Sequence, residues 1–241
     1  KSNLNIYKKI PTICENDKPH DISKSASIIL KKLSKIFSYL KPDLLIVLGD
    51  RYEILVTAFV ATLHKIPIAH ISGGETTEGS YDNQFRHSIS KMSFLHFVSN
   101  YIYKKKLIRM GENSKNIFNF GSISMDNLKR EVFISKQKIE KKFNIKFGKT
   151  NFLVTYHPET LSKKSSKLHF SEILKAISKF KKYNFIFTSS NCDEGGNIIN
   201  SMIIKYVKGR KNTFYVKSFG QTNYFSVLKN VDGVIGNSSS G

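Results

Sequence analysis

Short apolar runs alternate with helical patterns along most of the chain, and this alternation limits the possible folds more than any other feature. The runs LLIVL (44–48), IPIAHI (66–71) and FLHFVS (94–99) each follow a segment whose apolar residues have helical spacing. A short apolar run between turn residues is typical of a strand buried on both faces of a parallel sheet. The alternation therefore predicts βαβ units and an α/β fold.

The same alternation restarts near residue 151, after a charged segment at 127–150 that contains no strong strand pattern and predicts a helix and a linker. We therefore expect two doubly wound Rossmann-like domains, at residues 1–135 and 136–241, with the boundary near 130–148. The predicted helices cover 22–40 (with Asp21 as N-cap), about 52–64, 82–92, 100–110, 166–181, 195–207 and 222–230. Further strands are predicted in NIFNF (116–120), NFLVTY (151–156), YNFIFTSS (183–190), TFYVKS (213–218) and DGVIG (232–236).

A formal net charge of +21, from 39 Lys and Arg against 18 Asp and Glu, is compatible with nucleic-acid binding. Most of these cations are Lys scattered over predicted helix surfaces, whereas nucleic-acid interfaces rely on Arg with interleaved aromatic residues. The sequence favours an ordinary basic surface, and a basic nucleic-acid-binding module stays as an alternative of another class. Arg is found only at positions 51, 86, 109, 130 and 210.

Other features of the sequence narrow the class of protein. No apolar run approaches the ~20 residues that cross a bilayer, and the first residues lack a secretory signal. The two cysteines, Cys14 and Cys192, form neither a disulfide framework nor a zinc site by themselves. We expect a cytoplasmic protein that needs no metal or cofactor, with no membrane or nucleic-acid partner.

The loops that follow the predicted strands carry the residues with chemical potential, because ligands of open α/β sheets bind beyond the carboxyl ends of the strands. In the first half these loops are GDRYE (49–53) and SGGETTEG (72–79), which are rich in acids. In the second half YHPET (156–160), SSNCDEGG (189–196) and GNSSSG (236–241) supply a histidine, amides, hydroxyls and glycines. We expect the two sheets to bring these sets of residues to one cleft.

The acids of the first half allow two interpretations. Asp50 ends a predicted strand, where it serves either as the N-cap of the next helix or as an acid/base group. The glycines at 73 and 74 permit a turn that aims Glu75 back over the strand ends, and Asp82 opens a helix that carries Arg86 at i+4. Carboxylates from different loops suit general acid/base catalysis. The alternative is a set of caps, with an i,i+4 ion pair and a solvated pair between Arg51 and Glu53.

The loops of the second half favour binding over catalysis. GNSSSG lets the backbone approach a ligand closely and offers the hydroxyls of Ser238, Ser239 and Ser240, which suits a phosphate at a helix N-terminus. An ordinary Ser-rich turn is the alternative. His157 stands at a strand end before Pro158, where it either contacts a phosphate or sugar or serves a structural purpose.

Taken in order, these segments resemble the UDP-N-acetylglucosamine 2-epimerases, specifically the hydrolysing branch of sialic-acid synthesis. The resemblance is carried by KPDLLIVLGDRYE, IPIAHISGGETTEG, DNQFRHSISKMSFLHF, GSISMDN, VTYHPETL, FTSSNCD and GNSSSG. It implies a two-domain GT-B glycosyltransferase-like architecture and a chain that lacks both ends of the family sequence. It also implies conversion of UDP-N-acetylglucosamine and water to N-acetylmannosamine and UDP, through elimination to a glycal and hydration. The expected partners are the nucleotide sugar and further copies of the chain.

The resemblance also assigns roles to residues. Asp50 and Asp82 match catalytic carboxylates of the family, whereas Ser72 stands where the family has a third acid, so that either Glu75 takes that role or the substrate differs. The family's nucleotide-sugar contacts match Arg51, His157, Asn191, Ser238 and Ser239. We add Arg86 and Ser240 to this expected binding set. The rivals are a hydrolysing epimerase of a UDP- or GDP-linked 2,4-diacetamido sugar in legionaminic-acid synthesis, a non-hydrolysing epimerase and a GT-B glycosyltransferase.

Overall fold

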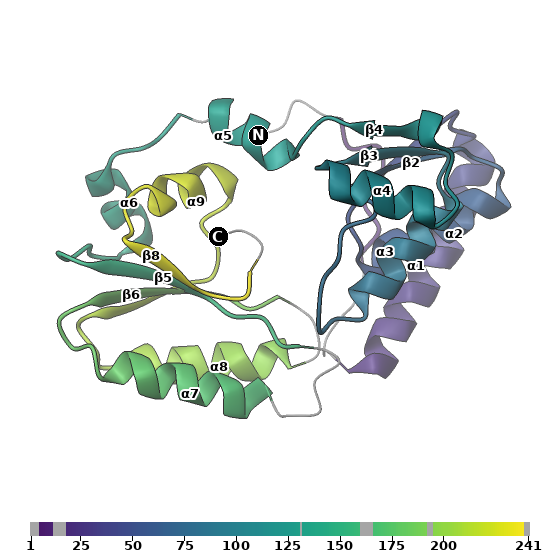
Figure 1. Ribbon diagram of the computed structural model, residues 1–241. Helices are drawn as coiled ribbons and strands as arrows, with labels where there is room; N and C mark the ends of the chain where they lie inside the picture. The colour runs from purple at the N-terminus through teal and green to yellow at the C-terminus, as the bar shows by residue number, and fades with distance from the viewer. Residues whose placement is uncertain (1–4, 12–17, 131, 160–165, 192–194, 239–241) are drawn as a thin grey trace. The chain divides into compact units, whose positions relative to one another are not determined.

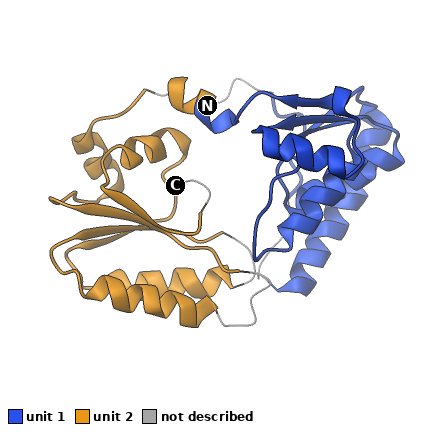
Figure 2. Ribbon diagram, viewed as in Figure 1, with its two compact units in different colours: residues 1–125 blue, residues 126–241 orange. Residues whose placement is uncertain are grey.

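The computed structural model of the protein describes residues 5–11, 18–130, 132–159, 166–191 and 195–238. The chain divides into two compact units, residues 1–125 and 126–241 (Figure 2). Each unit contains a parallel four-stranded sheet with helices between the strands. The predicted α/β class with two Rossmann-like sheets is therefore confirmed, whereas the domain boundary at 135/136 stays a prediction.

Unit 1 carries its strands in sequence order, β1-β2-β3-β4. The charged segment at 127–150, predicted as a helix and a linker, contains the end of one helix and the whole of a second. The elements of unit 1, together with the first helices after it, are α1 (Pro19–Leu40), β1 (Leu45–Leu48), α2 (Tyr52–Leu63), β2 (Ile68–Ile71), α3 (Asp82–Met92), β3 (Leu95–Val98), α4 (Tyr101–Arg109), η1 (Ser114–Asn116), β4 (Ile117–Asn119), α5 (Ile123–Arg130) and α6 (Lys136–Phe143). Figure 1 shows α1, α2 and α3 beside one another against this sheet.

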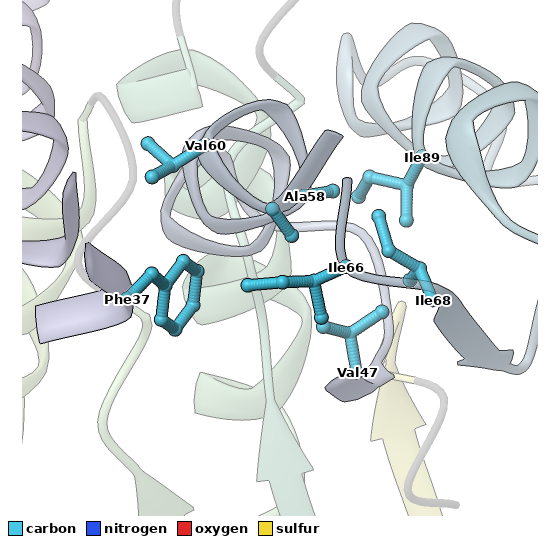
Figure 3. Close-up of a cluster of buried hydrophobic side chains, with 8 residues drawn as sticks. Phe37, Val47, Ala58, Val60, Ile66, Ile68 and Ile89 are labelled. Atoms are coloured by element: carbon cyan, nitrogen blue, oxygen red, sulfur yellow. The ribbon is translucent and has the colours of Figure 1, made fainter. Parts of the chain in front are cut away.

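The core of unit 1 lies between its sheet and these helices. Phe37 from α1, Ala58 and Val60 from α2, and Ile89 from α3 pack against side chains from the sheet such as Val47 (Figure 3). Burying an aliphatic or aromatic side chain of this size contributes about 1.5–3 kcal/mol to folding. The apolar residues whose helical spacing predicts α1, α2 and α3 thus include the residues that pack against the sheet.

Two details of unit 1 correct the sequence interpretation. The prediction that the first strand is buried on both faces is wrong, because Ile46 and Leu48 on β1 are 63% and 57% exposed while Val47 is buried. The helices that pack against this strand cover the Val47 face, and a run of apolar residues does not by itself reveal how many faces are covered. Asp21 is not the N-cap of α1, since Lys18 takes that position and Pro19 begins the helix.

Unit 2 has helices on both faces of its sheet, with α7 and α8 on one side and α6 and α9 on the other (Figure 1). Along β5, Leu153 packs with the α6 and α9 cluster and its neighbour Val154 packs with α7 and α8, as the period of two in a strand requires. The remaining elements are β5 (Asn151–Thr155), α7 (Ser166–Ser178), β6 (Asn184–Thr188), α8 (Gly196–Val207), β7 (Thr213–Val216), α9 (Gln221–Leu228) and β8 (Gly233–Gly236).

The strand order of unit 2 is β7-β6-β5-β8, so the order reverses between β5 and β8. Such a reversal makes the two flanking connections leave the sheet on opposite sides, which opens a crevice at the carboxyl ends of the strands. In the part of the chain that the structure describes, β5 is followed by residues 156–159 and β8 is followed by Asn237 and Ser238. The topology therefore places these residues of the two predicted binding loops at the position where this class of fold takes its ligands.

Candidate active site

Asp50 follows the end of β1, where Gly49 adopts a positive φ of 87°. It does not cap the next helix, because the N-cap position of α2 belongs to Arg51. The side chain of Arg51 contacts Glu53, with 3.2 Å between Nε and Oε2, and both side chains are partly exposed. The predicted pair between these two residues is thus present, while the carboxylate of Asp50 turns to a different partner.

The glycine-rich loop after β2 returns its acid to the strand ends, as expected. Gly74 has φ of +77°, and a Cβ there would lie 2.8 Å from the carbonyl oxygen of Tyr103, so both conformation and space require glycine. Glu75 follows directly, and its Oε1 accepts a hydrogen bond of 2.8 Å from Ser99 Oγ. Its Oε2 lies 2.8 Å from Nη1 of Arg86.

Arg86 joins the two acidic loops. Its guanidinium forms ion pairs with Asp50 and Glu75, and it also donates to the Ser72 carbonyl and to Thr77 Oγ1, each at 3.2 Å. The side chain of Arg86 is 8% exposed, whereas those of Asp50 and Glu75 are 18% and 27% exposed. The cation therefore lies beneath two carboxylates that solvent still reaches, and it offsets the repulsion between them.

Asp82 is the first residue of α3, as predicted. Its Oδ2 accepts a hydrogen bond of 2.8 Å from Ser80 Oγ, and its backbone N–H donates to the same hydroxyl at 3.1 Å. The backbone N–H of Thr77 donates to Asn83 Oδ1 at 3.4 Å, which ties the loop to the start of the helix. The loop and the first turns of α3 thus carry Glu75, Asp82 and Arg86 together.

Burial shifts the pKa values of three histidines in unit 1. Desolvation lowers the pKa of His70 to about 4, and the Gly49 carbonyl only partly opposes this. Desolvation also lowers the pKa of His87, assisted by the cations of Lys106 and Arg86. Burial lowers the pKa of His96 too, although its contact with Glu112 opposes the shift. The imidazole of His70 is therefore neutral at physiological pH.

In unit 2 the loops after β5 and β8 are joined by a pair of hydrogen bonds. His157 N–H donates to Asn237 Oδ1, and Asn237 Nδ2 donates to the His157 carbonyl, each at 2.8 Å. His157 Nδ1 accepts from the backbone N–H of Asn191 at 3.1 Å. An Nδ1 that accepts carries no proton, so the neutral ring holds its proton on Nε2. Ser238 is half-buried beside Asn237, and Ser239 and Ser240 lie outside the described residues.

The structure thus gathers Asp50, Glu75 and Arg86 in unit 1 and His157 and Asn191 in unit 2. Ser99 and Asn237 also take part, and sequence reasoning did not single them out, although each stands directly after a strand. Within the described ranges, no group of three or more His, Cys, Asp or Glu residues is placed to hold a metal ion. Nor is any helix in those ranges long and apolar enough to span a membrane.

Comparison with known proteins shows which protein family this sequence matches. The family model for UDP-N-acetylglucosamine 2-epimerase matches residues 1–241. A Campylobacter jejuni protein named GDP/UDP-N,N'-diacetylbacillosamine 2-epimerase (hydrolyzing) is 43% identical over 98% of this chain and 62% of its own length. The polysialic acid biosynthesis protein P7 of Escherichia coli is 40% identical over 99% of this chain and 61% of its own length.

The fold matches a solved structure as well. The crystal structure of UDP-GlcNAc 2-epimerase from Neisseria meningitidis, bound to UDP-GlcNAc, superimposes with a TM-score of 0.74 at 18% sequence identity. The match covers 92% of this chain and 62% of that chain. This sequence therefore spans about three fifths of the length of the relatives that it matches.

Proposed function

The chain belongs to the UDP-N-acetylglucosamine 2-epimerase family, and we propose that the full-length protein is a hydrolysing nucleotide-sugar 2-epimerase. The observation that carries the proposal is the pair of partly exposed carboxylates, Asp50 and Glu75, held by the buried guanidinium of Arg86. This cluster lies in a chain that matches the family along its whole length, and it stands at the carboxyl ends of parallel strands, where α/β folds bind ligands.

The chemistry explains why several acids are needed. Inversion at C2 breaks the C2–H bond, with the proton passing to a carboxylate, while the C1–O bond breaks and the nucleoside diphosphate leaves. Water then adds its hydroxyl to C1 of the unsaturated sugar, and a proton returns to C2 from the opposite face. Two acid/base groups on opposite sides of the ring satisfy this sequence. We assign these two roles to Asp50 and Asp82. Ser72 stands where the family has a third acid, and we propose that Glu75 takes the role of that acid.

In this proposal unit 2 binds the nucleotide. The described residues assigned to this role, His157, Asn191 and Ser238, carry no negative charge, which suits a diphosphate because a carboxylate would repel it. The reversal of strand order between β5 and β8 supports a binding crevice beside His157 and Ser238. We include Asn191 in this set, together with Ser239 and Ser240. From unit 1, Arg51 and Arg86 are proposed to contribute to binding of the nucleotide sugar.

The experiment uses the full-length protein with UDP-N-acetylglucosamine in deuterated water. The proposal predicts equimolar free UDP and N-acetylmannosamine that carries one deuterium at C2, detected by NMR. Release of UDP-N-acetylmannosamine without free UDP would indicate a non-hydrolysing epimerase. Absence of turnover with every nucleotide sugar offered, combined with salt-sensitive binding to DNA or RNA, would favour the nucleic-acid alternative.

A second candidate substrate is a UDP- or GDP-linked 2,4-diacetamido sugar. It is favoured by 43% identity to the Campylobacter relative with that name and by Ser72, which replaces an acid expected from the resemblance to the epimerase family. Parallel assays with UDP-N-acetylglucosamine and with both diacetamido donors decide between the two. The donor with the highest kcat/KM identifies the substrate, and a preference for UDP-N-acetylglucosamine would remove this candidate.

A further inference from the structure

We propose that His70 is a positioning residue for Asp50, in that its imidazole joins the carbonyl of Gly49 to the hydroxyl of Ser90 on α3. The inference rests on the proposed function, because it treats Asp50 as an acid/base group. His70 lies on β2, two strand positions after Ile68, and its side chain is completely buried. It makes no contact with substrate in this scheme and acts through the backbone that carries Asp50.

The two hydrogen bonds of His70 define its tautomer. Nε2 lies 2.8 Å from the Gly49 carbonyl oxygen, and Nδ1 lies 3.1 Å from Ser90 Oγ. A carbonyl oxygen only accepts, so Nε2 carries the proton and donates it, and Nδ1 then accepts from the Ser90 hydroxyl. Because both nitrogens are engaged and burial keeps the ring neutral, His70 is suited to holding geometry and not to transferring protons.

His70 thus forms a bridge from the Gly49 carbonyl to the Ser90 hydroxyl. The position of Ser90 connects this bridge to the ion pairs of Arg86 with the two acids. Ser90 follows Arg86 by four residues in α3, so the two side chains leave the same face of the helix. Arg86 contacts the carboxylate of Asp50, while His70 holds the carbonyl of the preceding residue. One helix face thus restrains Asp50 twice, through its side chain and through its backbone.

The glycine-rich loop packs against the same bridge. A Cβ on Gly73 would lie 3.0 Å from His70 Nδ1 and 3.0 Å from Ser90 Oγ, which is closer than most side-chain contacts. The loop therefore lies directly against the imidazole two residues before Glu75. Movement of the ring would disturb the acids after β1 and after β2 together.

Two variants separate positioning from simple filling of the core. His70→Gln can place an amide N–H near the site of Nε2 and keep the bond to Gly49, whereas His70→Asn is too short and reaches only toward Ser90. A misplacement on the order of 1 Å can cost roughly 100-fold in rate. We expect His70→Asn to lower kcat by about 10- to 100-fold while nucleotide affinity changes by less than about 2-fold, and His70→Gln to stay within about 5-fold of the unmodified protein.

The matched control is His64→Asn, because His64 Nε2 also contacts a serine hydroxyl, that of Ser34 at 3.3 Å, but has no described link to a strand end. It should leave kcat within about 2-fold, since its hydrogen bond does not reach the acids. Equal losses in kcat for His70→Gln and His70→Asn would overturn the proposal, because a packing role does not distinguish them. Unchanged kcat in His70→Asn would overturn it as well.

A readout independent of activity completes the test. Long-range ¹H–¹⁵N NMR of the histidine rings, with His70 assigned from the spectrum of a variant, reports its tautomer in the unmodified protein. A neutral ring protonated on Nε2 at pH 7 supports the bridge, and a ring protonated on Nδ1 overturns it, whatever the turnover. Complete inactivity of the unmodified protein would instead count against the proposed function, while the tautomer would still decide on the bridge.

Discussion

The two units build similar parallel sheets and equip the carboxyl ends of their strands in opposite ways. Unit 1 places the carboxylates of Asp50 and Glu75 over a buried guanidinium, whereas unit 2 joins His157 to neutral amides from Asn191 and Asn237. The two sheets are thus alike, and the side chains after each strand decide whether the carboxyl end of the sheet suits proton transfer or anion binding. The buried cation in unit 1 is the physical condition for keeping two carboxylates side by side.

Substitution of the unit 1 acids should have the largest effect on turnover. We expect Asp50→Asn and Asp82→Asn to lower kcat by about 10²- to 10⁴-fold, because an amide cannot exchange the required proton. Nucleotide affinity, measured by calorimetry, should change by less than about 3-fold, since the nucleotide is assigned to unit 2. Asp43→Asn, at an exposed residue before β1, is the control. Equal losses of affinity and kcat in the acid variants would erase the proposed difference between the units.

Replacement of Arg86 should have the largest effect on stability. We expect Arg86→Met to lower the free energy of unfolding by about 3–5 kcal/mol, because it leaves two carboxylates without their buried cation. Arg51→Met removes a partly exposed pair and should cost less than about 1 kcal/mol. Urea unfolding monitored by circular dichroism measures both. Similar values for the two variants would mean that burial does not distinguish these arginines.

The pH dependence of stability tests the neutral histidine of unit 1. The folded protein lowers the pKa of His70 from 6.5 to about 4, so the unfolded chain binds the proton first as pH falls. Stability should therefore decrease from about pH 6.5 to about pH 4, with a contribution from His70 of up to about 3 kcal/mol. Urea unfolding at pH 7 and pH 5 checks this, and His70→Gln should show a smaller decrease. An identical pH dependence in both proteins would contradict the shift.

Substitution in the unit 2 loops that are assigned to nucleotide binding should have the smallest effect, and it should change affinity alone. Asn237→Ala removes two hydrogen bonds between the loops after β5 and β8, which are worth about 1 kcal/mol each at most when exposed. We expect the Kd for UDP to rise by about 5- to 10-fold with kcat at saturation unchanged. Asn212→Ala, which removes similar bonds to Lys181 and Tyr183 before β7, is the control. A kcat loss in Asn237→Ala larger than the affinity loss would give unit 2 a share in the chemistry.

Part of the candidate site could be predicted from the chain because strand ends are local features. The position of Asp50 after an apolar run and of Asp82 at the start of a helical pattern both follow from spacing along the sequence. The partners of these acids could not be predicted in the same way. Arg86 lies four residues after Asp82, which favours an ion pair within the helix, yet its guanidinium reaches the carboxylate of Asp50, 36 residues earlier.

The sequence by itself determined the alternation of strands and helices, the parallel sheets and the loops that carry polar residues, because hydrophobic period and turn residues act over a few positions. The tertiary structure alone decided the strand order of each sheet, the exposure of one face of β1 and the sharing of Arg86 between two loops. These features depend on contacts between segments far apart in the chain. Their energies are set by burial and geometry, which local sequence does not specify.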